Sequence, residues 1–264
     1  MKSIIDFQKM KLDNEKISMI TAYDFVQAGI AKEAGIDIIL VGDSLATTVQ
    51  GKKNTLSVTM DEMIYHTKLV KEGAGDVFIL ADMPFMSYQT GPKEALINAG
   101  RLVKEAGANA VKIEGGAFLK ETIEKIVTAG IPVMAHIGLM PQFINMLGGY
   151  KVQGRSEAEA VKLASAAAEL EHAGAFMIVL EAIPEETSLV IQKAVNIPVI
   201  GIGAGRYTDG QVLVFYDVVG MLAAAPPKFV KKYADSRSIL IKALSDFRDE
   251  IKKGIFPSAE NIYK

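Results

Sequence analysis

The chain has 264 residues, 50% of them hydrophobic and 23% charged, so it can bury a large core, either as one barrel or as two small domains. Its formal net charge is -2 and no run of Lys or Arg exceeds a pair, which argues against nucleic acid or an anionic membrane as a partner. It has no cysteine, which excludes disulfides, thiolate metal sites and cysteine nucleophiles.

The N-terminal segment is charged throughout. Residues 1–24 lack the apolar core of a signal peptide, and no later segment approaches about 18 uninterrupted apolar residues. We therefore expect a cytoplasmic protein that acts on small molecules, with a helix at its N-terminus before the first strand.

Short apolar runs recur along the chain, and four of them follow an Ala-Gly pair that ends at Gly35, Gly107, Gly130 or Gly174. Glycine in a left-handed conformation ends a helix, and a nearly continuous apolar run after it is typical of a parallel strand covered on both faces. The predicted strands are residues 18–22, 36–41, 77–81, 108–113, 131–135, 175–180, 197–200 and 211–214.

Helices are predicted between these strands. Residues 59–62 and 156–159 match the capping box, in which a hydroxyl and a carboxylate satisfy backbone amides at a helix start, and Pro92 suits a first helical position. An extra amphipathic helix is predicted over residues 236–253, packed on the barrel or on a neighbouring subunit. Its apolar stripe consists of Ile239, Leu240, Leu244, Phe247 and Ile251.

The alternation of strands and helices defines the fold class. Eight strands at short intervals predict an α/β protein, a (β/α)8 TIM barrel that forms one catalytic domain over residues 1–264. An open doubly wound sheet would also alternate, but its first turn should carry a glycine-rich motif, which the turn after Ala22 lacks.

Four acidic residues close predicted strands at equivalent places. Asp43, Asp82, Glu114 and Glu181 each follow a glycine by seven or eight residues. At the carboxyl end of a parallel barrel they should meet, and a carboxylate cluster without cysteine favours a hard divalent cation such as Mg²⁺. Lys112 lies two residues before Glu114, on the same face of its strand, and can supply a further positive charge.

These residues also have structural interpretations. Strand-end acids often cap helices or form ion pairs. Ser44 is either an N-cap or a ligand donor, and His136, which ends another predicted strand, is either a core residue or a site residue. The glycine-rich segment 200–205 resembles the phosphate-binding loop of many barrels, but close packing also selects glycine.

Several blocks of the sequence resemble one enzyme family. The blocks are Thr21-Ala-Tyr-Asp24, Val41-Gly-Asp-Ser-Leu45, Ala81-Asp-Met-Pro-Phe-Met86, Val111-Lys-Ile-Glu-Gly115, His136-Ile-Gly-Leu139, Leu147-Gly-Gly-Tyr-Lys-Val-Gln-Gly154, Leu180-Glu181, residues 200–205 and Asp209-Gly-Gln-Val-Leu-Val214. They span nearly the whole chain and resemble ketopantoate hydroxymethyltransferase, a barrel of the phosphoenolpyruvate/pyruvate type. Residues 46–48, Met140 and Thr208 depart from the family's commoner residues.

The resemblance implies an activity and its cofactors. The enzyme would transfer a hydroxymethyl group from 5,10-methylenetetrahydrofolate to 3-methyl-2-oxobutanoate, giving ketopantoate for pantothenate and coenzyme A biosynthesis. One Mg²⁺ or another divalent ion per subunit would be ligated by Asp43 and Asp82, with Glu114 close to it directly or through water. The oxo acid would chelate the same ion, so both aspartates also belong to the substrate site. A homo-oligomer, a decamer, is implied as well.

The resemblance also implies roles for the other candidate residues. Ser44 and Lys112 would bind the carboxylate end of the oxo acid. Glu181 would be the general base that removes a proton beside the ketone, and partial burial could bring its pKa near the working pH. His136 would orient the substrate or a water on the metal.

Three alternatives remain at this point. A metal-dependent carbon–carbon lyase or mutase of the phosphoenolpyruvate-utilising type would share the barrel and the acids. A Schiff-base aldolase would instead use Lys112 as its nucleophile. A barrel without enzymatic activity, which binds ligands or supports assembly, would use the four acids only as caps and ion pairs.

Overall fold

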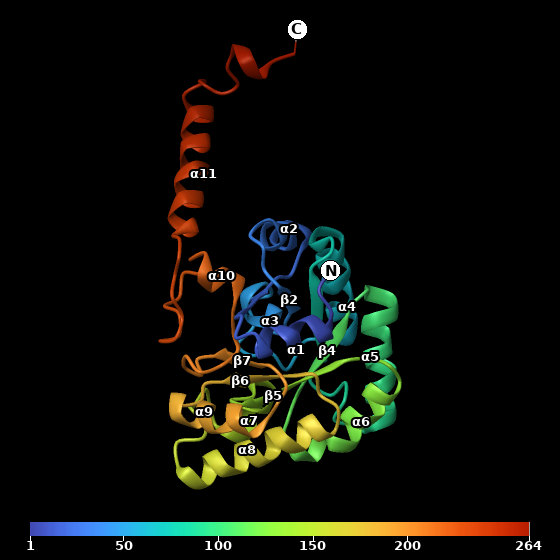
Figure 1. Cartoon of the computed structure of the whole chain (residues 1–264). Coiled ribbons are helices and arrows are strands. Elements are labelled where there is room, and N and C mark those ends of the chain that lie inside the picture. Colours follow the sequence, from blue (N-terminus) through green and yellow to red (C-terminus); the bar gives the residue numbers. More distant parts are fainter. Residues whose placement is uncertain (264) are drawn as a thin grey trace. The chain divides into compact units, whose positions relative to one another are not determined.

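The computed structural model describes residues 1–263. Contacts divide the chain into two compact units, Met1–Val214 and Phe215–Lys264. The first unit contains a closed barrel of parallel strands in the order β1 to β8, so the predicted (β/α)8 fold is confirmed (Figure 1). The expectation that residues 1–264 form a single domain stays a prediction.

The barrel unit alternates strands and helices as predicted. Its strands are β1 (Ile17–Thr21), β2 (Ile38–Val41), β3 (Phe78–Asp82), β4 (Ala110–Glu114), β5 (Val133–Gly138), β6 (Met177–Glu181), β7 (Val199–Ile202) and β8 (Gly210–Leu213). Its helices are α1 (Ile4–Leu12), α2 (Phe25–Glu33), α3 (Leu45–Thr48), α4 (Met60–Ala74), α5 (Pro92–Ala106), α6 (Lys120–Thr128), α7 (Ile144–Leu147), α8 (Glu157–His172) and α9 (Glu185–Ala194), with short 3₁₀ helices η1 (Ala117–Leu119) and η2 (Pro141–Phe143).

The predicted strand ends differ from the observed ones by at most three residues. Several predicted strands begin too early because apolar residues in the preceding turn are buried as well. Val77, Ala108 and Ala175 are such residues, with exposed fractions of 9%, 4% and 3%. Burial thus begins before strand pairing does.

Local sequence signals account for the helix ends. Both predicted capping boxes form, at the start of α4 and at the start of α8. Pro92 is the first residue of α5, as predicted. Gly107 ends α5 with a φ of 76°, a left-handed conformation that costs other residues more than glycine.

The strand register brings the carboxyl ends of neighbouring strands together. Asp82 pairs with Lys112 across β3 and β4, and Glu114 pairs with His136 across β4 and β5. Alternate residues of a strand point to the same face, so Lys112 and Glu114 lie on one face of β4. Asp43 follows the end of β2 by two residues.

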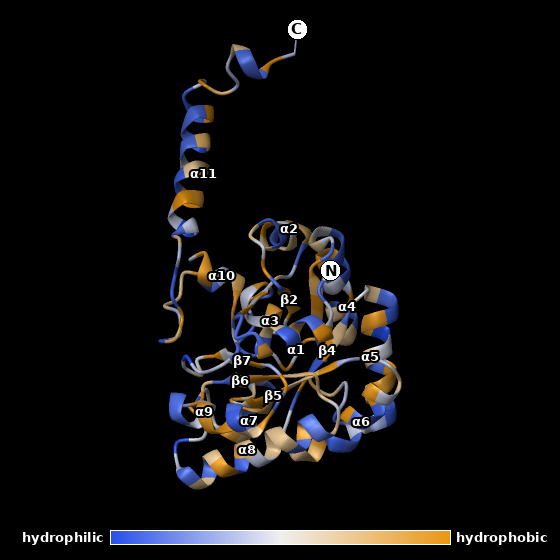
Figure 2. Cartoon of the chain, in the orientation of Figure 1, coloured by the Kyte–Doolittle hydropathy of each residue, from blue (hydrophilic) through white to orange (hydrophobic). Residues whose placement is uncertain are grey.

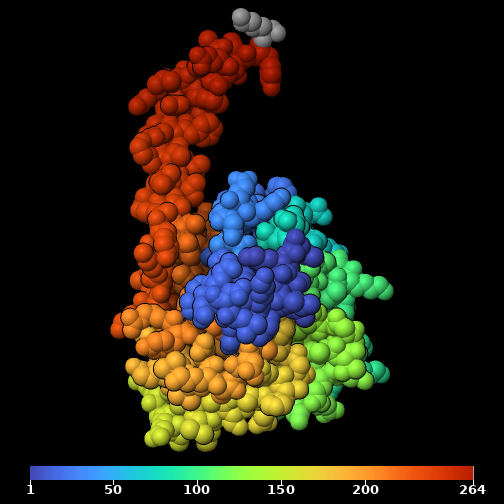
Figure 3. Space-filling model, viewed as in Figure 1, coloured from blue at the N-terminus to red at the C-terminus, as the bar shows by residue number. Residues whose placement is uncertain are grey.

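The core fills the inside of the barrel, and α1 contributes to it. Phe7 and Met10 belong to the same buried cluster as residues of all eight strands that include Met19, Leu80 and Val179. The rings of Phe7 and Phe78 lie 5.2 Å apart in an edge-to-face arrangement. Figure 2 shows hydrophobic residues concentrated in the strands, and Figure 3 shows the N-terminal segment across the viewed face of the barrel unit.

The second unit contains α10 (Phe215–Val218), α11 (Ser236–Lys252) and the 3₁₀ helix η3 (Ala259–Asn261). The extra C-terminal helix is therefore confirmed. Its predicted apolar stripe is exposed, with Ile239 at 67% and Leu244 at 67%. Within residues 1–263, no helix has the length and apolar character needed to cross a membrane.

Candidate active site

A cavity of about 120 Å³ lies at the carboxyl end of the barrel strands. Every site residue predicted from the sequence lines it. These residues are Asp43, Ser44, Asp82, Lys112, Glu114, His136 and Glu181. Apolar side chains complete the lining, among them Leu40, Met134, Val179, Ile202 and Val212. The fold thus brings together charged residues that are far apart in the sequence, next to an apolar surface.

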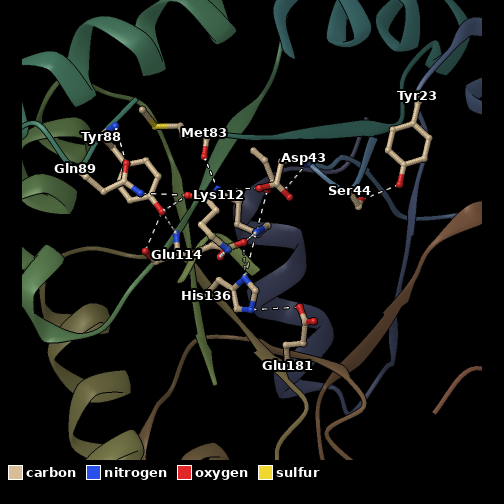
Figure 4. A network of polar contacts seen from close by, with 12 residues as sticks. Tyr23, Asp43, Ser44, Met83, Tyr88, Gln89, Lys112, Glu114, His136 and Glu181 are labelled. Carbon is tan, nitrogen blue, oxygen red and sulfur yellow. Dashed lines mark hydrogen bonds and ion pairs between the residues drawn. The ribbon is translucent and has the colours of Figure 1, made fainter. Parts of the chain in front are cut away.

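Lys112 lies among the charged groups. Its Nζ is 3.0 Å from Asp82 Oδ1, 3.5 Å from Glu114 Oε1 and 3.2 Å from His136 Nδ1 (Figure 4). Burial lowers the pKa of Lys112, but attraction to Asp82, Glu114 and Asp43 outweighs this effect and raises the pKa above its ordinary value. The lysine therefore stays positively charged although it is only 5% exposed.

His136 connects two of the carboxylates. Its Nδ1 lies 3.4 Å from Glu114 Oε1, and its Nε2 lies 3.5 Å from Glu181 Oε2 (Figure 4). The histidine is 2% exposed. Its strand, β5, continues to Gly138, so the prediction that His136 ends the strand is wrong. The strand is longer because Gly138 still pairs with Glu181 of β6.

Glu181 is the most accessible of the four carboxylates, with 18% of its side chain exposed. Burial raises the pKa of Glu181 to about 7, and His136 opposes this rise. A carboxyl group that titrates near neutral pH can both accept and release a proton under physiological conditions.

The two aspartates lie next to each other. The backbone N–H of Asp43 donates a hydrogen bond of 3.0 Å to Asp82 Oδ2. Burial, together with the charges of Glu114 and Asp82, raises the pKa of Asp43 well above its ordinary value. Burial also raises the pKa of Asp82, although Lys112 opposes it. Both groups thus favour additional positive charge nearby.

The pKa of Glu114 is shifted in the opposite direction. Burial alone would raise its pKa, but attraction to His136 and Lys112 outweighs burial and lowers the pKa to about 2. Its side chain also accepts a hydrogen bond of 3.0 Å from the backbone N–H of Gln142. Glu114 therefore stays ionised at neutral pH.

Gln142 was not predicted from the sequence, and it holds several groups of the cavity in place. Its Nε2 donates hydrogen bonds of 3.0 Å to Asp43 Oδ2 and to the carbonyl oxygen of Met83. Its Oε1 accepts from the hydroxyl of Tyr88 at 2.8 Å. Through these bonds Gln142 connects the ends of β2, β3 and β4. Gln142 is 3% exposed, so the connection lies inside the protein. The signal that could have identified it is its place in η2, shortly after the end of β5.

Ser44 occupies the N-cap position of α3, but its side chain makes no capping hydrogen bond. Its Oγ instead lies 2.8 Å from the hydroxyl of Tyr23 (Figure 4). A Cβ at Gly42 would lie 2.8 Å from Ser44 Oγ and 3.6 Å from Asp82 Oδ2. Glycine at position 42 therefore keeps space open between these two groups.

The other two histidines do not line the cavity, whereas the glycine-rich segment 200–205 reaches it at Ile202, which pairs with Glu181. His66 and His172 lie in helices α4 and α8. In the glycine-rich segment 200–205, Gly203 and Gly205 have φ values of 61° and 80°, and a phosphate-binding role for this segment stays a prediction. Among residues 1–263, no three His, Asp or Glu side chains are arranged as a complete metal site.

Comparisons with known proteins give a consistent result over the whole chain. A family model described as ketopantoate hydroxymethyltransferase matches residues 1–259. The 3-methyl-2-oxobutanoate hydroxymethyltransferase of Thermotoga maritima is 54% identical over 256 residues, which cover 97% of this chain and 94% of the relative.

Solved structures with the same fold are more distant in sequence. The complex of phosphonopyruvate hydrolase with oxalate and Mg²⁺ has a TM-score of 0.60 at 12% identity, covering 100% of this chain and 92% of that one. 2,3-Dimethylmalate lyase, a member of the PEP mutase/isocitrate lyase superfamily, has a TM-score of 0.58 at 16% identity, covering 99% and 90%. These similarities show the fold alone.

Proposed function

The chain belongs to the ketopantoate hydroxymethyltransferase family, and from this premise we propose how its cavity carries out the reaction. The enzyme makes ketopantoate by adding a hydroxymethyl group to 3-methyl-2-oxobutanoate. The main support for the proposed mechanism is the cluster of four buried or nearly buried carboxylates around Lys112 and His136 at one end of the barrel.

Asp43 and Asp82 fit a divalent cation. Their oxygens are hard ligands, each residue is 3% exposed, and the pKa of each is raised by burial. Mg²⁺ is commonly held by one or two carboxylates while water and substrate complete its coordination, so a complete protein cage is unnecessary. In this proposal Asp43 and Asp82 are direct ligands, and Glu114 stands beside the ion directly or through one water.

The cation would supply one part of the chemistry. When bound, it would polarise the ketone oxygen of the substrate and stabilise the negative charge that forms there as the neighbouring carbon loses its proton. Glu181, whose pKa is about 7, would accept that proton. His136, 3.5 Å away, would hold the Glu181 carboxylate in position.

The remaining residues would orient the substrate. Lys112 and Ser44 would bind the carboxylate of the oxo acid, Lys112 with its permanent charge and Ser44 with its hydroxyl. The apolar lining, which includes Leu40 and Val179, would receive the branched carbon chain.

We propose 5,10-methylenetetrahydrofolate as the second substrate. The deprotonated carbon of the oxo acid would form a bond to the methylene carbon of the folate as one carbon–nitrogen bond of the folate breaks. Water would then replace the second nitrogen at that carbon, and the two nitrogens would leave protonated as tetrahydrofolate, with one proton from the oxo acid and one from water. Water supplies the hydroxyl group, so oxo acid, methylenetetrahydrofolate and water balance ketopantoate and tetrahydrofolate. No oxidant or reductant is needed.

The activity is tested by incubating the protein with 3-methyl-2-oxobutanoate, methylenetetrahydrofolate and Mg²⁺ and measuring ketopantoate. We expect ketopantoate, loss of activity with a chelator and recovery with Mg²⁺. Turnover of oxaloacetate or isocitrate in place of ketopantoate formation would favour the lyase or mutase alternative. Borohydride trapping of a Lys112 adduct, with activity that survives the chelator, would favour the aldolase.

Assembly and location are further parts of the proposal. We propose a homo-oligomer, a decamer, in which a neighbouring subunit covers the exposed apolar stripe of α11. Light scattering of the purified protein tests the mass. We also propose a cytoplasmic location, which the absence of cysteine permits and which cell fractionation tests.

A further inference from the structure

Three buried polar atoms in the cavity lack a hydrogen-bond partner. Across residues 1–263, the buried side-chain atoms without such a partner are Thr55 Oγ1, Asp82 Oδ1 and His136 Nε2, and all three residues line the same cavity. Lys112 Nζ lies 3.0 Å from Asp82 Oδ1 and forms an ion pair with it. A buried polar atom without a partner is unfavourable and requires a reason.

The proposed function gives two of these three residues a role. Asp82 would bind the cation, and His136 would hold Glu181 at 3.5 Å. Thr55 has no role in that proposal, although it is only 4% exposed and lines the cavity with the others. Its hydroxyl therefore marks a place where a ligand atom is expected.

The backbone around Thr55 is fixed by hydrogen bonds from both sides. The N–H of Lys52 donates to the carbonyl oxygen of Ala46 at 2.8 Å. The side-chain oxygen of Asn54 accepts from the N–H of Leu56 at 3.2 Å, which forms a local turn around Thr55. Thr55 is thus held at the cavity by a defined loop.

The carboxylate of the oxo acid needs more donors than the proposed function supplies. A carboxylate can accept about four hydrogen bonds. Ser44 Oγ is already 2.8 Å from the hydroxyl of Tyr23, and Lys112 Nζ already contacts Asp82, Glu114 and His136. The hydroxyl of Thr55 has no such competing partner within the protein.

We propose that Thr55 is a substrate-binding residue whose hydroxyl donates a hydrogen bond to the carboxylate of the 2-oxo acid. This inference rests on the proposed function. It gives the third unpartnered polar atom of the cavity a ligand of defined chemistry.

The test compares Thr55→Val with Thr67→Val. Thr67 is a matched control because it is fully buried, but its hydroxyl already donates to the carbonyl oxygen of Met63 at 2.6 Å within α4. Binding of 3-methyl-2-oxobutanoate with Mg²⁺ present is measured by calorimetry, and thermal unfolding is measured without ligand. Thr55→Ser, which keeps the hydroxyl, is the rescue variant.

We expect Thr55→Val to raise the Kd for the oxo acid about tenfold, the size of a lost hydrogen bond to a charged group. Its unfolding temperature should not fall, because the hydroxyl that is removed had no partner in the free protein. Thr67→Val should instead lower the unfolding temperature and leave the Kd unchanged. Thr55→Ser should bind nearly as tightly as the wild type.

An unchanged Kd for the oxo acid in Thr55→Val would overturn the inference. If the unfolding temperature of Thr55→Val also fell as far as that of Thr67→Val, the Thr55 hydroxyl would have a structural role instead. Ketopantoate shares the 2-oxo acid end, so its Kd should rise equally. A rise for ketopantoate alone would place the contact on the hydroxymethyl group and also overturn the inference. Failure of the wild type to form ketopantoate would instead contradict the proposed function.

Discussion

Glu181 and Glu114 are of the same residue type but have opposite surroundings. Burial raises the pKa of Glu181 to about 7, whereas His136 and Lys112 outweigh the effect of burial on Glu114 and lower its pKa to about 2. At neutral pH Glu114 therefore contributes a fixed negative charge, while Glu181 can change its protonation state. This difference assigns the proton transfer to Glu181.

The pH dependence of the reaction should report Glu181. We expect kcat/KM to rise with pH through about 7 and then level off, because only the deprotonated carboxylate accepts a proton. Glu181→Gln should lower kcat about 1,000-fold and remove this pH dependence. The pH dependence is measured from profiles of kcat/KM against pH. Proton removal is measured by NMR, as the exchange of hydrogen for deuterium at carbon 3 of the oxo acid in D₂O. Exchange at the wild-type rate in Glu181→Gln would show that another group is the base.

Gln142 positions the carboxylates without carrying charge. Gln142→Met keeps much of the side-chain volume but removes the hydrogen bonds to Asp43 and Met83. Loss of such supporting contacts typically weakens metal binding, and we expect a Kd for Mn²⁺ or Mg²⁺ that is about 10–100-fold higher. Calorimetry with the metal alone measures the effect.

Gln192→Met is the control for this substitution. Gln192 donates its side-chain hydrogen bond to Asp209 at 3.1 Å, and neither residue lines the cavity. The Gln192→Met variant should bind the metal with the affinity of the wild type. Equal affinities for both variants would mean that Gln142 does not position the metal ligands.

At the scale of elements, α1 completes the barrel core. Phe7 is fully buried and its ring packs edge to face against Phe78 of β3. Lys11 of the same helix forms a 3.1 Å ion pair with Asp209, just before β8, and donates to the carbonyl oxygen of Ile197 at 2.7 Å. The helix is thus tied to the barrel by apolar and polar contacts.

Removal of the Phe7 ring should destabilise the folded protein. We expect Phe7→Ala to lower the free energy of unfolding by about 3–5 kcal/mol, because it leaves a cavity in the core. Ile5→Ala, in the same helix but 76% exposed, should change it by less than about 0.5 kcal/mol. Denaturant titrations of both variants measure the difference. Similar losses would mean that α1 is not an integral part of the core.

Elements and site residues differ in how far the sequence predicts them. Glycine spacing and capping boxes are local signals, so strands and helix starts could be predicted to within a few residues. Asp43, Asp82, Glu114 and Glu181 were found because strand ends converge in any parallel barrel. Gln142 lies in the 3₁₀ helix η2 and Thr55 in a loop, and the paths of both segments depend on tertiary contacts. Only the place of Gln142 shortly after a strand end marks it in the sequence.

At the scale of the whole molecule, the cavity makes stability depend on pH and on cations. The pKa values of Asp43, Asp82 and Glu181 are all raised by burial, so the folded protein binds more protons than the unfolded chain. The stabilisation that comes from these extra bound protons is fully present below the ordinary carboxyl pKa. It is lost as the pH rises through the raised pKa values of the folded protein, and the raised pKa of Glu181 is about 7.

Metal-free protein should therefore become less stable by a few kcal/mol from about pH 5 to about pH 8. Mg²⁺ should raise the unfolding temperature more at the higher pH, since it binds the ionised aspartates. Calorimetric scans with and without Mg²⁺, at matched ionic strength, measure this. Equal effects of Mg²⁺ at both pH values would contradict cation binding by Asp43 and Asp82.

Phe7 and Met10 of α1 are buried in the barrel core with residues of all eight strands, so we expect small molecules to reach the 120 Å³ cavity from the loop side. A folate is far larger than this cavity and would obstruct that entrance. The small acid must then enter first and its product leave last, a compulsory order. In steady-state inhibition, ketopantoate should compete with the oxo acid, and tetrahydrofolate should compete with neither substrate.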